Sequence, residues 1–282
     1  MNRYKYTDKA RAHLHELSQD GGTTYAPLIG TTTALNEVFP PPLAWWGSAQ
    51  ALQRFGWITE KKEPDVMKRE ELLKKGQDEV RLAADMNLED YRSLLESCYK
   101  AHDEYKKSKG KEGVDIHALI EEMIRFCLDK NGGQPTTMYR EQLPAFTEWA
   151  MRDVKQFLWS EAHCYSSRLF VGGITDFGFI HKNGKVIVGD NKPSIYPKNF
   201  IQTALYGIQI KENGLCDASG KPLDVGWNAT ESDFPKIDGY CIFDYNKGVV
   251  RYRIDIERLE RIGETAIDLY KNKDVIGSLT LE

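Results

Sequence analysis

The stretch VGGITDFGFIHKNGKVIVGDNK, residues 171–192, contains two apolar segments on either side of Lys182-Asn183-Gly184. Its aromatic and β-branched residues predict two strands, and an Asn-Gly pair is typical of the turn in a β-hairpin. The number of residues in the turn sets the register of the two strands. The register in turn decides whether Asp176 and Asp190 lie on the same face of the sheet, because side chains alternate between faces.

Two loop lengths are open for this hairpin. A two-residue turn at Asn183-Gly184 would point Asp176 and Asp190 to opposite faces of the sheet. A three-residue loop, with Gly184 in the left-handed conformation, places Asp176 directly across from Asp190. We favour the three-residue loop because it separates an apolar face from a face that holds two carboxylates and Lys192.

Two carboxylates on neighbouring strands, with β-carbons about 5 Å apart, repel each other unless a cation lies between them. Carboxylate oxygens favour hard ions such as Mg²⁺ or Mn²⁺. Lys192 lies two residues beyond Asp190, on the same face, and can reach a phosphate or an attacking water. This set of groups is typical of metal-assisted phosphodiester hydrolysis. The other interpretation is that Asp176 and Asp190 are surface residues paired with lysines.

The composition is that of an ordinary globular protein, because 41% of the 282 residues are hydrophobic and 28% are charged. Such a chain can bury one large core or two smaller ones. The formal net charge of -4 excludes a protein that coats nucleic acid by charge alone. A protein that binds nucleic acid through a local basic groove is still allowed.

The five cysteines are scattered and contain no C-x-x-C pair, so neither a disulfide framework nor a zinc or iron-sulfur cluster is expected. The N-terminal residues carry charges throughout and do not form a secretory signal. No apolar run is long enough to span a membrane. These features predict an intracellular, cytoplasmic protein with no membrane partner.

The chain changes character near residue 156. Before this point, apolar residues at three- and four-residue spacing predict helices at 7–18, 43–56, 64–86, 88–108, 114–130 and 139–156. After it, strands are expected at 157–167, 172–181, 185–192, 237–245 and 248–254. Further helices are expected at 196–213 and 255–272, with a long loop at 214–236 between them. This order favours an α/β fold with a mixed central β-sheet flanked by helices and a helical N-terminal region.

These motifs together resemble the RecB-like branch of the PD-(D/E)XK nuclease superfamily. That branch has a helix with a histidine, then G-x-x-D, then D-x-K after a hairpin, then Q-x-x-x-Y on the next helix. The parts occur here in that order, at His117 in GVDIHALIEEM, Asp176 in GGITD, Asp190 and Lys192 in VIVGDNK, and Gln202 with Tyr206 in FIQTALYG. Glu161 in LWSEAHCYS matches an acidic residue of the family, and LIGTTTALNEVFPPPLAWWGSAQA matches its N-terminal segment more loosely.

The resemblance implies a restriction-endonuclease-like core and a role for each matching residue. Mg²⁺ or Mn²⁺ would be held by His117, Asp176, Asp190 and the backbone carbonyl of Asn191. Lys192 would orient or activate the water and stabilise developing negative charge. Gln202 and Tyr206, one helical turn apart, would brace the site or the substrate strand, with Glu161 as a supporting acid.

Two positions depart from the family pattern. Asn191 stands where relatives carry an aromatic or aliphatic residue, and Pro193 replaces a common threonine. We expect a change in packing from Asn191 rather than lost chemistry. Some relatives hold an iron-sulfur cluster through four cysteines, and we expect no such cluster here.

The resemblance also implies a division of the chain and a substrate. Residues 1–110 would form a helical region, able to act as an arch that guides DNA, and residues 111–282 the nuclease core. A run of lysines before the His117 helix is expected to contact phosphates; it comprises Lys106, Lys107, Lys109 and Lys111.

The expected activity is a metal-dependent deoxyribonuclease, an exonuclease on single-stranded DNA or DNA ends. A prokaryotic or phage origin and a helicase or recombination partner are expected with it. The alternative is a catalytically inactive nucleic-acid-binding module of the same fold.

Overall fold

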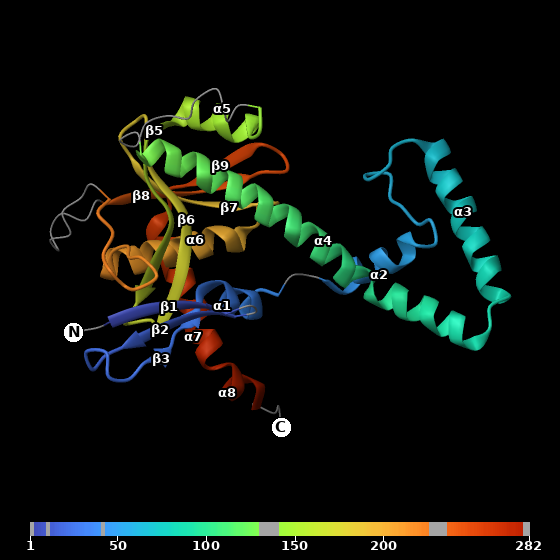
Figure 1. The fold of residues 1–282 in the computed structure, drawn as a ribbon, viewed down its shortest axis with the longest axis horizontal. Helices are drawn as coiled ribbons and strands as arrows, with labels where there is room; N and C mark the ends of the chain where they lie inside the picture. The colour runs from blue at the N-terminus through green and yellow to red at the C-terminus, as the bar shows by residue number, and fades with distance from the viewer. Residues whose placement is uncertain (1–2, 10–11, 41–42, 130–140, 226–235, 279–282) are drawn as a thin grey trace. The chain divides into compact units, whose positions relative to one another are not determined.

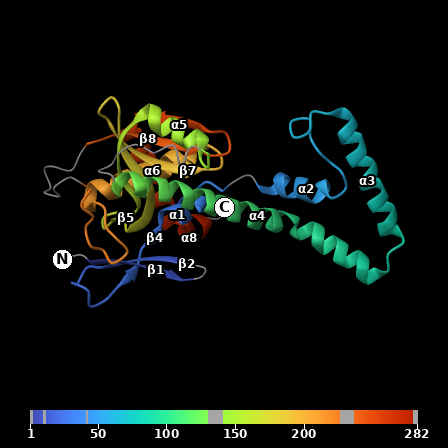
Figure 2. The same ribbon diagram turned by 45° about the horizontal axis from the view of Figure 1, so that its top comes forward.

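The computed structural model describes residues 3–9, 12–40, 43–129, 141–225 and 236–278. The chain divides into two compact units (Figures 1 and 2). The sheet unit comprises residues 1–39 and 116–282, and the helical unit comprises residues 40–115.

The centre of the sheet unit is a six-stranded mixed β-sheet. Its strands pair in the order β4-β6-β7-β8-β9. β4 and β7 pair with different parts of one edge of β6, and β5 pairs with the opposite edge. The pairs β5/β6, β6/β7 and β8/β9 are antiparallel, whereas β4/β6 and β7/β8 are parallel. The strands are β4 Ile29–Gly30, β5 Val154–Ser166, β6 Val171–His181, β7 Val186–Lys192, β8 Ile237–Asp244 and β9 Val249–Arg253.

Helices cover both faces of this sheet, which confirms the expected mixed sheet flanked by helices. On one face, the end of α4 (Leu88–Asp129) and α5 (Pro144–Asp153) pack on Phe177 and Phe179 in one hydrophobic core. On the other face, α6 (Pro197–Asn213) forms a second core with β5, β7 and β8. A third core joins α6 to α1 (Thr31–Val38) and α7 (Ile256–Lys271), and α8 (Lys273–Ser278) follows α7.

The helix expected at 7–18 is wrong, because this segment forms strands. β1 (Arg3–Lys9) pairs with β2 (Ala12–Ser18), and β2 pairs with β3 (Ala26–Pro27). Alternation along β2 buries His15 and Leu17. The buried position 15 carries a polar side chain, whose Nδ1 lies 2.6 Å from the Tyr4 hydroxyl. A hydrophobic periodicity cannot reveal a buried face that is partly polar.

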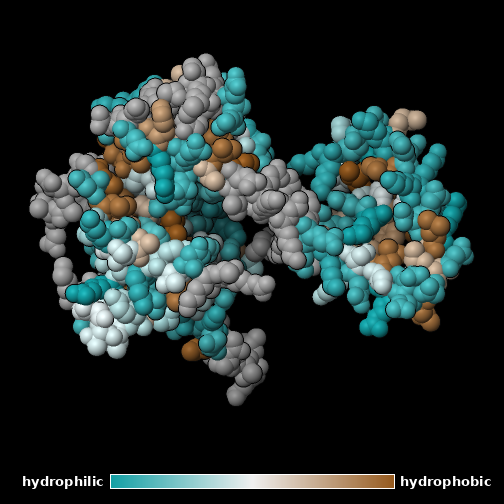
Figure 3. Space-filling view, in the orientation of Figure 1, coloured by the Kyte–Doolittle hydropathy of each residue, from teal (hydrophilic) through white to brown (hydrophobic). Residues whose placement is uncertain are grey.

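The helical unit contains α2 (Leu43–Gln53), α3 (Val66–Ala84) and the first part of α4. α3 packs closely against the backbone of Phe55 at Gly76, where an added β-carbon would lie only 2.1 Å from that backbone. Among the described side chains of this unit, Cys98 is the single buried hydrophobic one. Large hydrophobic side chains such as Leu73 and Val80 are exposed instead. Figure 3 shows hydrophobic residues, in brown, on the surface of this unit.

Two expectations about this region need correction. The helices expected at 88–108 and 114–130 form one helix, α4, because Gly110 and Gly113 cost only about 1 kcal/mol each in a helix interior and do not end it. The boundary expected at residue 110 also differs from the division found, in which residues 1–39 belong to the sheet unit. Across the described residues, no helix is long and apolar enough to cross a membrane.

Candidate functional site

The hairpin of β6 and β7 has the register of the three-residue loop, as predicted. Phe179 pairs with Ile187 and Phe177 with Gly189. The amide of His181 donates to the Lys185 carbonyl at 2.8 Å, and Gly184 has a φ of 87°. Gly184 is needed here because a positive φ of this size strains other L-residues.

The ladder between β6 and β7 ends at the Phe177–Gly189 pair, and the two acidic residues lie just beyond it. There the Asn191 amide donates to Oδ2 of Asp176 at 2.7 Å in place of a backbone partner. Asp176 and Asp190 are both buried. The two carboxylates therefore lie close together, although Asp176 and Asp190 do not themselves form a pair of the ladder.

Lys192 is the cation closest to these carboxylates among the described ion pairs, and its Nζ lies 2.7 Å from Oδ2 of Asp190. Burial and the neighbouring Asp176 raise the pKa of Asp190 to about 7, although the Lys192 charge opposes this shift. Burial acts to lower the pKa of Lys192, but Asp190 and Asp176 outweigh it and raise the pKa. Within the described residues, no hydrogen-bond donor reaches Oδ1 of Asp190.

A possible ligand set for a metal ion forms where α4 meets β5 and β6. One nitrogen of His117 and one carboxylate oxygen each of Glu161 and Asp176 lie within 4.8 Å of one another. His117 Nδ1 is 3.5 Å from Oδ2 of Asp176. Burial and the Lys192 charge lower the pKa of His117, which keeps the imidazole neutral at pH 7 and able to act as a ligand.

Glu161 has a strained backbone. Its φ is 46°, a left-handed conformation that glycine adopts far more easily than glutamate. Ser160 pairs with Phe177 and Ala162 with Thr175, so Glu161 stands beside Asp176 in the ladder of β5 and β6. Burial and the Asp176 carboxylate raise the pKa of Glu161 to about 8. Strain of this kind is concentrated at functional sites, where the surrounding structure holds it in place.

The Q-x-x-x-Y residues lie on α6, and both side chains are buried. Gln202 Nε2 donates to the Tyr206 hydroxyl at 2.7 Å and lies 3.2 Å from Oγ1 of Thr32 at the start of α1. Burial and the Asp190 charge raise the pKa of Tyr206, which keeps the phenol protonated. The structure therefore joins α6 to α1 through Gln202 and places Tyr206 near the charges of Asp190 and Lys192.

A run of four lysines on α4 was expected to contact phosphates. The backbone of this run is part of α4, within the helical unit, and its side chains lie outside the described residues. The role of the run stays a prediction; it comprises Lys106, Lys107, Lys109 and Lys111.

Arg125 is a residue near the acids that the sequence analysis missed. It lies on α4, eight positions after His117, and its guanidinium contacts Oε1 of Glu121 at 2.5 Å. Its charge also acts to lower the pKa of Glu161. The signal that could have found it is helical spacing, since residues eight apart return to the same face of a helix.

The residues present fit a divalent cation. The carboxylates and the neutral imidazole are the donor types that Mn²⁺ accepts, and carboxylates suit Mg²⁺. The buried Oδ1 of Asp190 lacks a donor within the described residues and is an oxygen that an ion would satisfy. A cation would also relieve the repulsion that raises the pKa values of Glu161 and Asp190.

No protein-family model and no curated protein sequence matches this chain.

Proposed function

We propose that this protein is a divalent-metal-dependent nuclease with a restriction-endonuclease-like fold. The observation that carries the proposal is the meeting of ligand atoms from His117, Glu161 and Asp176 within 4.8 Å of one another. A buried Asp190 paired with Lys192 stands beside them. Acids on both strands of one hairpin, with a lysine two residues after the second acid, support this fold over other mixed α/β folds.

The residues that would hold the ion are His117, Glu161, Asp176, Asp190 and the backbone carbonyl of Asn191. A bound Mg²⁺ or Mn²⁺ would lower the pKa of a water and neutralise charge on the phosphate. Lys192 adds a cation that can contact a non-bridging phosphate oxygen or orient the attacking water, because its ammonium is already held toward the acids by Asp190. Gln202 and Tyr206 brace the wall of the site from α6.

The proposed substrate is DNA, either single-stranded or with free ends, and the proposed mode is exonucleolytic. A helicase or recombination protein that supplies such ends is the partner that this activity needs. The proposal for the substrate rests on the resemblance in the D-x-K and Q-x-x-x-Y motifs and on the intact set of acids.

The proposal can be tested with linear single-stranded DNA labelled at the 5′ or 3′ end and with a circular strand of the same sequence. With Mn²⁺ or Mg²⁺, we expect the linear strand to be degraded from one end and the circle to survive. Cleavage of both forms at equal rates would contradict the exonuclease. Binding without cleavage of either form would favour the inactive binding module.

A further inference from the structure

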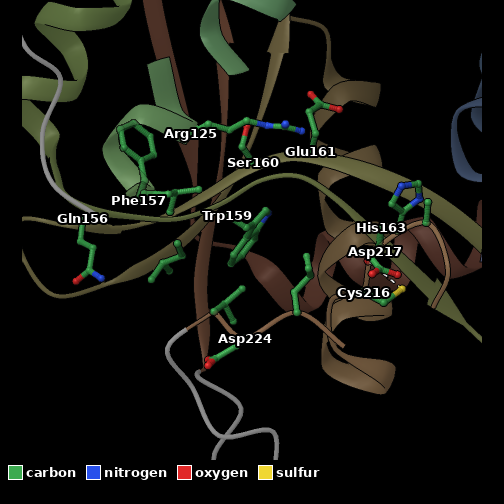
Figure 4. A pocket seen from close by; sticks show the side chains of 15 residues that line it. Arg125, Gln156, Phe157, Trp159, Ser160, Glu161, His163, Cys216, Asp217 and Asp224 are labelled. Atoms are coloured by element: carbon green, nitrogen blue, oxygen red, sulfur yellow. Dashed lines mark hydrogen bonds between the residues drawn. The ribbon is translucent and has the colours of Figure 1, made fainter. Parts of the chain in front are cut away.

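A cavity of about 720 Å³ opens beside the edge strand β5, between β5 and the loop that follows α6. Figure 4 shows Trp159 and Ser160 along its wall and Asp217 at its far side. Its volume lies in the range of sites that hold small molecules. Arg125 and Glu161 also line it, so the cavity and the possible metal ligands share Glu161.

The far end of the cavity is closed by backbone hydrogen bonds. His163 and Cys216 exchange two N–H to carbonyl bonds of 2.9 and 3.0 Å on the outer edge of β5. This bridge fixes the loop against the strand. An occupant therefore extends from this bridge toward Glu161 and the metal ligands.

The walls combine apolar surface with polar groups at defined points. Leu223 and Val225 of the loop face the apolar and aromatic residues of β5. The Ser160 hydroxyl is buried and has no hydrogen-bond partner among the described residues. Asp217 accepts hydrogen bonds from the Ser219 hydroxyl and from the backbone amides of Ser219 and Lys221, which lower its pKa and keep it ionised as an acceptor.

A nucleobase has the complementary chemistry. Its faces are apolar, and the amino groups on its edge donate to carboxylates such as Asp217. Arg125 is exposed at the mouth and extends toward Ser160 and Glu161 (Figure 4). Its partner Glu121 lies on the preceding turn of α4, so a phosphate can replace that carboxylate at the guanidinium without a change of fold.

We propose that this cavity receives the unpaired base of the nucleotide next to the scissile phosphate, and that Arg125 contacts a phosphate of that strand. The inference rests on the proposed function and specifies its substrate as a single strand. A base in a duplex is stacked and paired, and it would have to leave the helix to enter. Single-stranded ends supply such a base without that cost.

The test places 2-aminopurine at successive positions of a linear single strand and measures its fluorescence with Ca²⁺ in place of Mg²⁺. Ala218 is an exposed residue that lines the cavity, so Ala218→Trp fills the space from the loop. The matched control is Lys221→Trp, on the same loop, whose side chain is exposed and does not line the cavity. We expect one position to change its fluorescence in the wild type and in Lys221→Trp, but not in Ala218→Trp.

Strand affinity should fall about tenfold in Ala218→Trp, the loss expected when one stacked base is excluded. An abasic site at the responsive position should weaken binding to the wild type by a similar factor, and it should not weaken binding to Ala218→Trp further. Equal fluorescence and affinity in both tryptophan variants would overturn the inference, even if metal-dependent cleavage is intact. A responsive position that only Ala218→Trp loses, in a protein without cleavage, would support the cavity and contradict the proposed nuclease.

Discussion

The Lys192 ammonium lies 2.7 Å from Oδ2 of Asp190, a carboxylate whose side chain is 1% exposed. Asp176 lies near the same carboxylate and raises its pKa. A buried carboxylate of this kind depends on its cation, because removing one partner of a buried ion pair leaves an uncompensated charge. The pair is therefore important for stability as well as for the proposed chemistry.

Replacing Lys192 by methionine should destabilise the metal-free protein by about 3 kcal/mol, since Asp190 then loses its cation. The measurement is urea unfolding with EDTA present. The double variant Lys192→Met/Asp190→Asn should recover most of this loss, because position 190 then carries no charge that needs a cation. A Lys192→Met protein as stable as the wild type would show that Asp190 does not need the Lys192 charge for folding.

Mn²⁺ should raise the melting temperature of the wild type, because a ligand that binds only the folded state stabilises it. Glu161→Gln and Asp176→Asn should each remove most of this rise by deleting a charged ligand. The control is Glu122→Gln, an exposed position on α4 outside the ligand set. An unchanged Mn²⁺ response in the two ligand variants would place the ion elsewhere.

The left-handed backbone of Glu161 predicts an effect on folding stability that does not depend on metal or substrate. Glu161→Gly should be about 1 kcal/mol more stable than Glu161→Ala, because glycine adopts a φ of 46° without the Cβ strain. The comparison uses urea unfolding without metal. On the exposed strand position Arg251 the order should reverse, with alanine more stable than glycine. The same order at both positions would refute the strain at Glu161.

Burial and the neighbouring His163 lower the pKa of His15 to about 4 from its ordinary 6.5. Below pH 6.5 the unfolded chain therefore takes up a proton that the folded protein does not. The contribution of His15 to the free energy of unfolding is therefore fully present above pH 6.5. It falls by about 3 kcal/mol as the pH drops toward 4. His15→Gln should lose less stability over that range, whereas His13→Gln, at an exposed position, should follow the wild type. Parallel pH profiles for His15→Gln and the wild type would contradict the assignment.

The sequence predicted the hairpin best, because its register depends on local chemistry. The turn residues and the alternation of faces are set within residues 171–192, and the three-residue loop followed from them. Helix α6 and five of the six strands of the sheet were also predicted to within a few residues, whereas the short β4 was not expected. Their periodic apolar faces explain this, since each faces a hydrophobic core.

Features that depend on distant contacts could not be predicted in the same way. The N-terminal hairpin was missed because its buried face includes His15, which is satisfied by Tyr4 from the neighbouring strand. The positive φ of Glu161 and the place of Arg125 beside it depend on how α4 crosses β5. A single sequence does not show which distant elements lie close together in space. The cavity between them could therefore not have been found without the structure.

The most direct test of the central claim is the initial rate of single-stranded DNA hydrolysis with Mn²⁺, compared between the wild type and Asp190→Asn. The account predicts metal-dependent hydrolysis by the wild type, abolished by EDTA, and a loss of at least about 100-fold in a folded Asp190→Asn protein. Equal rates in the two proteins, or hydrolysis that persists in EDTA, would contradict it.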